Sequence, residues 1–139
     1  MSRRTMKKFA LVLAIAPFLL GMGSSGPVSD SIPRPKEAYR ADLVDRQGLL
    51  TRVDFLACDG KTFLPLERGE GTLMVPFSKV RKVTVGTEAG SRVKAKIEVE
   101  GSKNLEGALP RSLLCTGVTE YGNYQVEIRG LQEISFAQP

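Results

Sequence analysis

Two stretches of the sequence decide the fold: GTLMVPFSKVRKVTV at residues 71–85 and GNYQVEIRGLQEISF at residues 122–136. Laid over each other at an offset of about 50 residues, they carry apolar side chains at the same places: Leu73, Val75, Phe77, Val80, Val83 and Val85 against Tyr124, Val126, Ile128, Leu131, Ile134 and Phe136. The spacing is two residues, then three, then two again. Because only a turn of helix puts residues three apart on one face, each stretch predicts a strand, one helical turn and a second strand.

The sequence around these stretches is also typical of strands. Short apolar runs with β-branched residues are separated by glycine-containing turns, and no segment keeps a helical period over three turns, which predicts an all-β fold. The dipeptide Asp59-Gly60 has the composition of a two-residue hairpin turn. The clearest strand covers residues 92–100, where charged residues alternate with an apolar set, Val93, Ala95, Ile97 and Val99.

Counting strands back from Val85 gives five in residues 39–86, and a strand, a helical turn and a closing strand is how small five-stranded barrels of the Sm or Src-homology type end. Residues 87–139 allow a similar count, with an insertion at residues 107–117. We therefore predict two small barrel-like or sandwich β units, 39–86 and 87–139, related by a weak internal repeat. Each would be small for a domain, so the two would pack on each other or share a sheet. A single sandwich is the alternative.

The N-terminus predicts export. Four cations, Arg3, Arg4, Lys7 and Lys8, precede the uncharged run of residues 9–20, and small residues follow. This is the pattern of a secretory signal peptide, here residues 1–23, and the run is too short to span a membrane. An uncleaved anchor or a buried N-terminal helix is the alternative. Residues 24–38 are rich in Ser, Gly and Pro and predict a flexible linker. The expected location is periplasmic or secreted, with no transmembrane span after cleavage.

Removal of the signal peptide changes the charge of the protein. The chain has 20 Lys and Arg against 15 Asp and Glu, a net charge of +5. Four of these cations lie in the signal peptide and no carboxylate does, so the mature chain carries 16 cations and 15 anions, a net charge of +1. Such a chain lacks the field that gathers a polyanion, and nucleic acid is not an expected partner.

The residue types present exclude several classes of enzyme. The chain has no His, which removes the commonest general base, Ser–His and Cys–His nucleophiles and His-ligated zinc. It also has no phosphate-binding, dinucleotide-binding or calcium-binding loop. We predict no catalytic residue, no metal and no cofactor. The competing hypothesis uses carboxylates for acid–base chemistry or a divalent ion, and its candidates are Asp42, Asp45, Asp54 and Asp59.

A second set of candidates is cationic: Lys79, Arg81 and Lys82, then Arg92, Lys94 and Lys96. The last three share one strand face, where an anionic polymer, a lipid headgroup or an acidic partner could dock. A solvated outer face or a charge-guarded edge strand is the alternative. Tyr121 and Tyr124 flank Gly122 and form either a small binding surface or ordinary packing.

The two cysteines, Cys58 and Cys115, predict one disulfide, because an exported protein with two cysteines has the number and the compartment for a single bridge. Neither lies in a CxxC pair or beside a His, so no redox or metal role is indicated. Two separately buried thiols are the alternative.

The stretch CTGVTEYGNYQVEIRGLQEISF at residues 115–136, together with residues 71–85, resembles small exported bacterial proteins of no established function. The shared pattern is glycine and apolar spacing, so the resemblance implies an envelope location and transfers no site. We therefore predict a non-catalytic envelope interaction or assembly module whose partner is an envelope protein or an anionic polymer. The alternative is a small carboxylate-based hydrolase or an anionic-ligand-binding protein. The sequence does not set the oligomeric state.

Overall fold

The computed structural model describes residues 36–137, and the signal peptide and nearly all of the linker predicted above lie outside these residues. The described residues fold into strands joined by turns and three 3-10 turns, which confirms the all-β prediction. Among them, no helix is long and apolar enough to cross a membrane. The strands are β1 (Ala41–Asp45), β2 (Leu50–Cys58), β3 (Phe63–Arg68), β4 (Gly71–Pro76), β5 (Val80–Ala89), β6 (Arg92–Val99), β7 (Lys103–Pro110), β8 (Leu114–Thr119), β9 (Gly122–Glu127) and β10 (Leu131–Phe136).

The two stretches with matching apolar spacing, residues 71–85 and 122–136, both fold as that spacing predicts. Residues 71–85 form β4, the 3-10 turn η3 (Phe77–Lys79) and the first part of β5. Residues 122–136 form β9, the 3-10 turn η5 (Ile128–Gly130) and β10. Phe77 and Ile128 begin the two turns and are both buried, which is why the apolar spacing changes from two to three at these positions. The third turn, η4 (Glu100–Ser102), joins β6 to β7.

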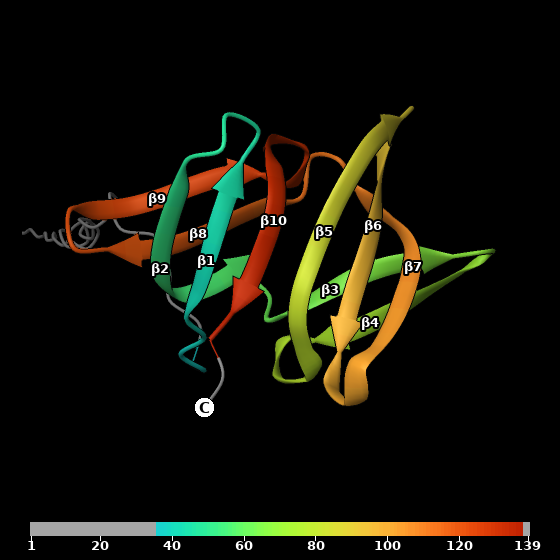
Figure 1. The fold of residues 1–139 in the computed structure, drawn as a ribbon, viewed down its shortest axis with the longest axis horizontal. Coiled ribbons are helices and arrows are strands. Elements are labelled where there is room, and N and C mark those ends of the chain that lie inside the picture. The colour runs from blue at the N-terminus through green and yellow to red at the C-terminus, as the bar shows by residue number, and fades with distance from the viewer. Residues whose placement is uncertain (1–35, 138–139) are drawn as a thin grey trace, which may run out of the picture. The chain divides into compact units, whose positions relative to one another are not determined.

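All ten strands belong to one antiparallel sheet, in the order β4-β3-β7-β6-β5-β10-β1-β2-β8-β9 (Figure 1). The centre of the sheet is the pair β5 and β10. Read outward from this pair, one side is β5, β6, β7, β3, β4 and the other is β10, β1, β2, β8, β9. Each side ends in a hairpin, β3–β4 or β8–β9, and in Figure 1 each hairpin lies behind the three front strands of its side.

Each side of the sheet takes strands from both halves of the chain. From the second half of the chain, β6 pairs with β5 and β7 pairs with β3, both of the first half. From the first half, β1 pairs with β10 and β2 pairs with β8, both of the second half. The short turn after β5 explains why β6, from the second half of the chain, lies beside β5, from the first half. Only Gly90 and Ser91 separate Ala89 from its register partner Arg92. With φ of +64°, Gly90 makes the tight turn that places β6 beside β5.

Two local predictions need correction or refinement. The insertion predicted at residues 107–117 is wrong, because β7 runs to Pro110 and β8 begins at Leu114. The turn at Asp59-Gly60 is confirmed, since both residues have positive φ, +51° and +74°. However, the turn is closed only by an isolated bridge between Cys58 and Lys61, and β2 continues beside β8 and does not pair with β3.

The inward faces of the strands enclose one apolar core. On β6 the alternation is as predicted, with Val93, Ala95 and Ile97 buried and the residues between them facing outward. Near the centre of the sheet, the Phe77 ring lies 5.6 Å from the Tyr39 ring, edge-on, and 5.0 Å from the Phe136 ring. These contacts tie turn η3 to both ends of the described chain.

Candidate functional site

Two of the four candidate carboxylates bind arginines. The Nε of Arg52 donates to Oδ1 of Asp42 at 2.8 Å, and the Nε of Arg40 donates to Oδ1 of Asp54 at 2.8 Å. The hydrogen bond from Arg52 holds the pKa of Asp42 below its usual value, a shift that burial partly opposes. A carboxyl group held in its charged form by a neighbouring guanidinium is a poor general acid.

The other two carboxylates accept backbone hydrogen bonds, one within a turn and one from a distant strand. Oδ1 of Asp45 accepts the backbone N–H groups of Gln47 and Leu49, each at 2.9 Å, and so fixes the β1–β2 turn. Oδ1 of Asp59 accepts the backbone N–H of Leu114 at 2.9 Å. Within residues 36–137 no three carboxylate or cysteine side chains gather as a metal site would require. All four candidates therefore have structural partners.

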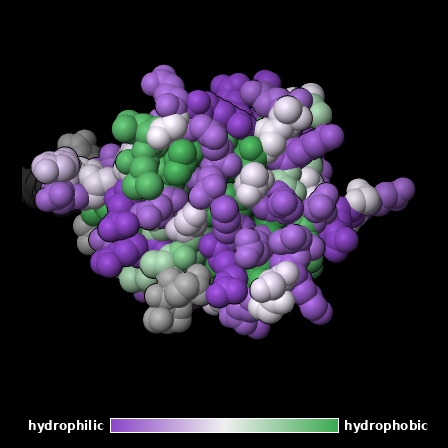
Figure 2. All heavy atoms as spheres, viewed as in Figure 1, coloured by the Kyte–Doolittle hydropathy of each residue, from purple (hydrophilic) through white to green (hydrophobic). Residues whose placement is uncertain are grey.

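The six candidate cations lie on turn η3 and on the outward side of β5 and β6. Three of them face carboxylates: Arg92 contacts Glu67 at 2.7 Å, Lys82 contacts Glu133 at 3.7 Å, and Lys96 is the register partner of Glu106. The other three, Lys79, Arg81 and Lys94, form no ion pair within the described part of the chain. Figure 2 shows a largely hydrophilic face, with a hydrophobic patch near the start of β2, where Leu49 and Leu50 are exposed.

The two tyrosines do not share an environment. Tyr121 is 91% exposed at the tip of the β8–β9 hairpin. Tyr124 packs against the apolar core. The packing alternative therefore describes Tyr124, whereas Tyr121 is a solvent-exposed turn residue.

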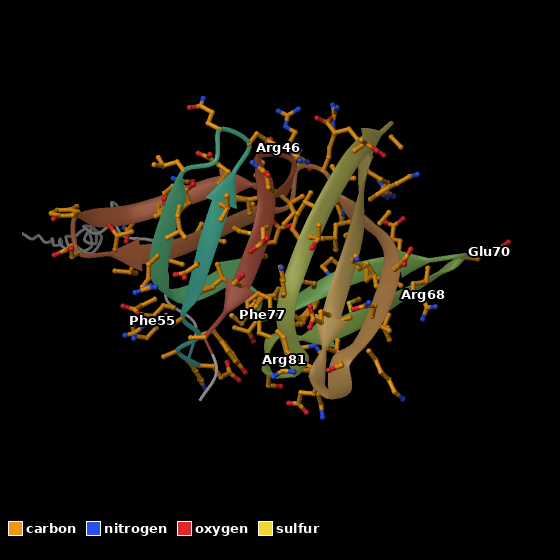
Figure 3. All side chains as sticks on the ribbon, viewed as in Figure 1. Arg46, Phe55, Arg68, Glu70, Phe77 and Arg81 are labelled. Atoms are coloured by element: carbon orange, nitrogen blue, oxygen red, sulfur yellow. A yellow bond between two sulfur atoms is a disulfide. The ribbon has the colours of Figure 1, made fainter. Side chains whose placement is uncertain are left out.

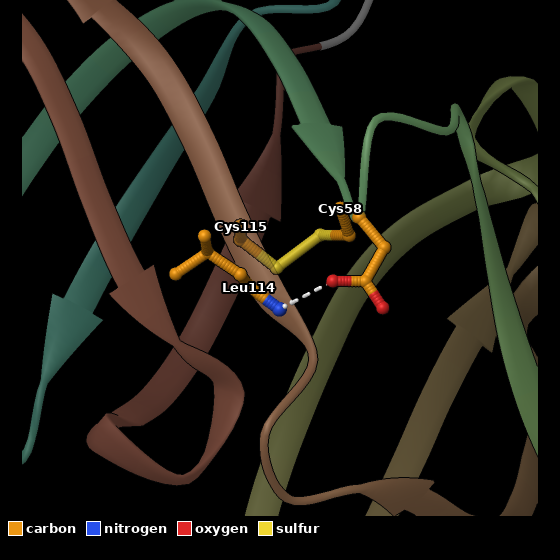
Figure 4. Close-up of a disulfide and its surroundings, with 4 residues drawn as sticks. Cys58, Leu114 and Cys115 are labelled. Carbon is orange, nitrogen blue, oxygen red and sulfur yellow. Dashed lines mark hydrogen bonds between the residues drawn. A yellow bond between two sulfur atoms is a disulfide. The ribbon is translucent and has the colours of Figure 1, made fainter. Parts of the chain in front are cut away.

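The predicted disulfide is present. Cys58 and Cys115 are register partners on β2 and β8, and their sulfur atoms are bonded (Figure 4). Their Cα atoms are 3.9 Å apart, and the bond links positions 57 residues apart in sequence. Figure 4 also shows the hydrogen bond between Leu114 and Asp59 beside the bridge. A disulfide of this kind is compatible with a location outside the cytoplasm.

A cavity of about 620 Å³ lies where η3 and η4 meet the two ends of the described chain. Aromatic rings line part of it, and its charged residues are Arg40, Arg81 and Glu100. Arg40 is already bound to Asp54, and the carboxylate of Glu100 offsets Arg81. Figure 3 shows Phe77 and Arg81 close to each other near the lower ends of the strands. This cavity does not concentrate charge of one sign.

The two edge strands of the sheet, β4 and β9, present different side chains. Strands β4 and β9 each have a neighbour on one side only, so each leaves backbone groups unpaired. On β9 the side chains that alternate with the core-facing Tyr124 and Val126 are polar: Asn123, Gln125 and Glu127. The equivalent positions on β4 are Thr72, Met74 and Pro76. The β9 edge thus has a polar side chain at all three positions, whereas on the β4 edge only Thr72 is polar and Met74 is an exposed apolar side chain.

The exposed apolar side chains of β4 lie beside a groove. Leu73 is 42% exposed and Met74 is 55% exposed. The groove has a volume of about 320 Å³, and we call it the β4 groove; its lining residues are Leu73, Met74, Val75, Pro76, Lys79, Val99, Glu100 and Leu105. The sequence offers one signal for it, since Leu73, Met74 and Val75 are three consecutive apolar residues on a strand that should alternate.

The backbone groups that β4 directs outward follow from its register with β3. Arg68 and Gly71 flank a two-residue turn and therefore form a hydrogen-bonded pair, after which bonded and non-bonded pairs alternate. Pro65, which has no N–H, accordingly falls opposite Met74 in a non-bonded pair. Thr72 and Met74 thus direct their N–H and C=O groups away from β3, and Pro76, further along, has no N–H to donate.

Comparison with known proteins places the chain in a family without supplying an activity. A family model described as "Uncharacterised protein" matches residues 35–139. The chain belongs to this family. It is also 22% identical over 131 residues to an "Uncharacterized protein" of Aquifex aeolicus (strain VF5), an alignment that covers 94% of this chain and 96% of that protein. No solved structure matches the chain.

Proposed function

We propose that this protein is an exported, non-catalytic interaction module that pairs through the β4 edge with an extended segment of another polypeptide. The observation that carries the proposal is the contrast between the two edges of the sheet. One edge is guarded by polar side chains, whereas the other presents Leu73 and Met74 beside an apolar groove. An added strand would take up the outward backbone groups of Thr72 and Met74 and place an apolar side chain in the groove.

The alternatives are less well supported by the described residues. The carboxylates named for a hydrolase bind arginines or accept backbone hydrogen bonds, and acid–base catalysis needs carboxyl groups that face a substrate. The basic face named for an anionic ligand includes cations that contact or face carboxylates. Because half of the six cations contact or face carboxylates, this surface attracts a polyanion less strongly than six unpaired cations would. An interaction module needs neither a base nor a basic patch.

The first test concerns export. When the chain is produced in a bacterium with its own N-terminus, we expect N-terminal sequencing of the extracytoplasmic fraction to begin near Ser24 or Gly26. The reason is the signal-peptide pattern of residues 1–23. Intact Met1 in a soluble cytoplasmic pool would contradict export. It would not bear on pairing through the β4 edge, which the second test examines.

The second test concerns the β4 edge. A photo-crosslinking amino acid in place of Met74 should give a covalent adduct with a protein when cells that export the chain are irradiated. The same amino acid in place of Gln125, the equivalent position on the guarded β9 edge, is the matched control and should give little adduct. Thr72→Pro should abolish the adduct, because it removes an outward N–H that an added strand needs. Equal yields from both positions, or no adduct from Met74, would refute the proposal.

A further inference from the structure

The backbone edge of β4 is complementary to itself. We propose that β4 pairs antiparallel with β4 of a second copy of this chain, with Leu73 opposite the partner's Leu73. This inference rests on the proposed function, since it names the strand that adds to the β4 edge. It joins the two sheets edge to edge around a two-fold axis that passes between the two leucines.

The outward backbone groups fix this register. An antiparallel pair alternates bonded and non-bonded positions, and β4 directs the N–H and C=O of Thr72 and Met74 outward. Pairing Thr72 with the partner's Met74 lets each residue exchange two backbone hydrogen bonds, and the two-fold axis repeats the arrangement. Leu73 then falls at the central non-bonded position. Pro76 donates nothing at the end of the strand, so no outward N–H from Gly71 to Pro76 is left unpaired.

The side chains agree with this register. Directly opposite residues of an antiparallel pair project from the same face, so the two Leu73 side chains come together over the apolar part of the groove, beside Val99 and Leu105. On the opposite face, Met74 lies beside the partner's Thr72. The pairing therefore covers the two most exposed apolar residues of β4.

The charges at the ends of the strand are also complementary. The register places the partner's Glu70 opposite Pro76, next to Lys79, which lines the same groove. Within the described residues neither Glu70 nor Lys79 has an ion-pair partner. Figure 3 shows Glu70 at the tip of the β3–β4 hairpin, where it points away from the sheet. Two such pairs form in a symmetric dimer. The β9 edge offers none, because its equivalent residues are Tyr121 and Gly130.

The expected dimer is weak. A strand of six residues offers a short edge for contact, and stable interfaces usually bury more than roughly 1,000 Å². We therefore expect an equilibrium between monomer and dimer that shifts over micromolar to millimolar concentrations.

Sedimentation equilibrium on the full mature chain measures this association. Thr72→Pro should weaken it by at least about tenfold, because two backbone hydrogen bonds are lost across the axis. Asn123→Pro, the same change at the equivalent position of β9, should leave it unchanged. Glu70→Lys should weaken the dimer by repulsion, and the added change Lys79→Glu should restore it. A wild-type chain that stays monomeric throughout, or a dimer that Thr72→Pro does not affect, would overturn the inference.

A cysteine at the two-fold axis tests the register independently of affinity. Leu73→Cys should form an intermolecular disulfide on mild oxidation, because central non-bonded partners have Cα atoms about 4.5 Å apart. Tyr124→Cys, the equivalent change on β9, is the control and should not. Absence of a linked dimer from Leu73→Cys would refute this register. If the chain is monomeric but Met74 crosslinks to a different protein in cells, the proposed function stands and this inference fails. If the Met74 adduct has the mass of two copies, both hold.

Discussion

Reduction of the Cys58–Cys115 disulfide is expected to lower the free energy of unfolding by about 4 kcal/mol. The bond closes a loop of 57 residues, and opening such a loop returns conformational freedom to the unfolded chain. The same bond fastens β2, near the start of the described chain, to β8, near its end. Four kcal/mol is a large share of the total stability of a domain of this size.

Urea denaturation of the mature protein with and without a reductant measures this difference. The double variant Cys58→Ala with Cys115→Ala is the control: it should unfold as easily as the reduced protein, and the reductant should not change its midpoint. If the oxidised and reduced forms differ by less than about 1 kcal/mol, the unfolded chain gains little from the opened loop, and the apolar core alone holds the two strands together.

Gly107→Ala is expected to cost about 3 kcal/mol or more of stability. At this point β7 passes over β3, with Glu67 and Ala108 as their one register pair. A Cβ on residue 107 would overlap the backbone carbonyl oxygen of Glu67 and would lie 3.0 Å from Cγ of Leu66, which is buried. Because the obstacle is backbone rather than a flexible side chain, the two strands would have to separate.

Gly86→Ala is the matched control, since residue 86 also lies within a strand of the sheet. A Cβ there would be 3.4 Å from Cβ of Lys94, an ordinary contact, and we expect a change within about 0.5 kcal/mol. Thermal unfolding of both variants, followed by circular dichroism, compares them directly. Similar melting temperatures for the two variants would show that β3 and β7 can move apart at little cost.

The groove beside β4 shows why the candidate site was harder to predict than the fold. The run Leu73, Met74 and Val75 breaks the alternation of a strand, but a sequence does not reveal which strand will lie at the edge of a sheet. The same applies to the carboxylates and cations. Asp59 is a good candidate in isolation, but it is occupied because β8 brings the Leu114 N–H to it.

The sequence by itself determined the local structure: the strands, their alternation on β6, the 3-10 turns after β4 and β9, and the positive-φ turn at Asp59-Gly60. These features depend on residues close together in the chain, so the apolar periodicity and the composition of the turns are enough to predict them. The cysteine pair followed from their number and the predicted compartment. Tertiary structure decided which strands pair when they lie far apart in the sequence. The turn at Gly90 places β6 beside β5, and β1 then pairs with β10, because pairing partners far apart in sequence are selected by the packing of the whole core.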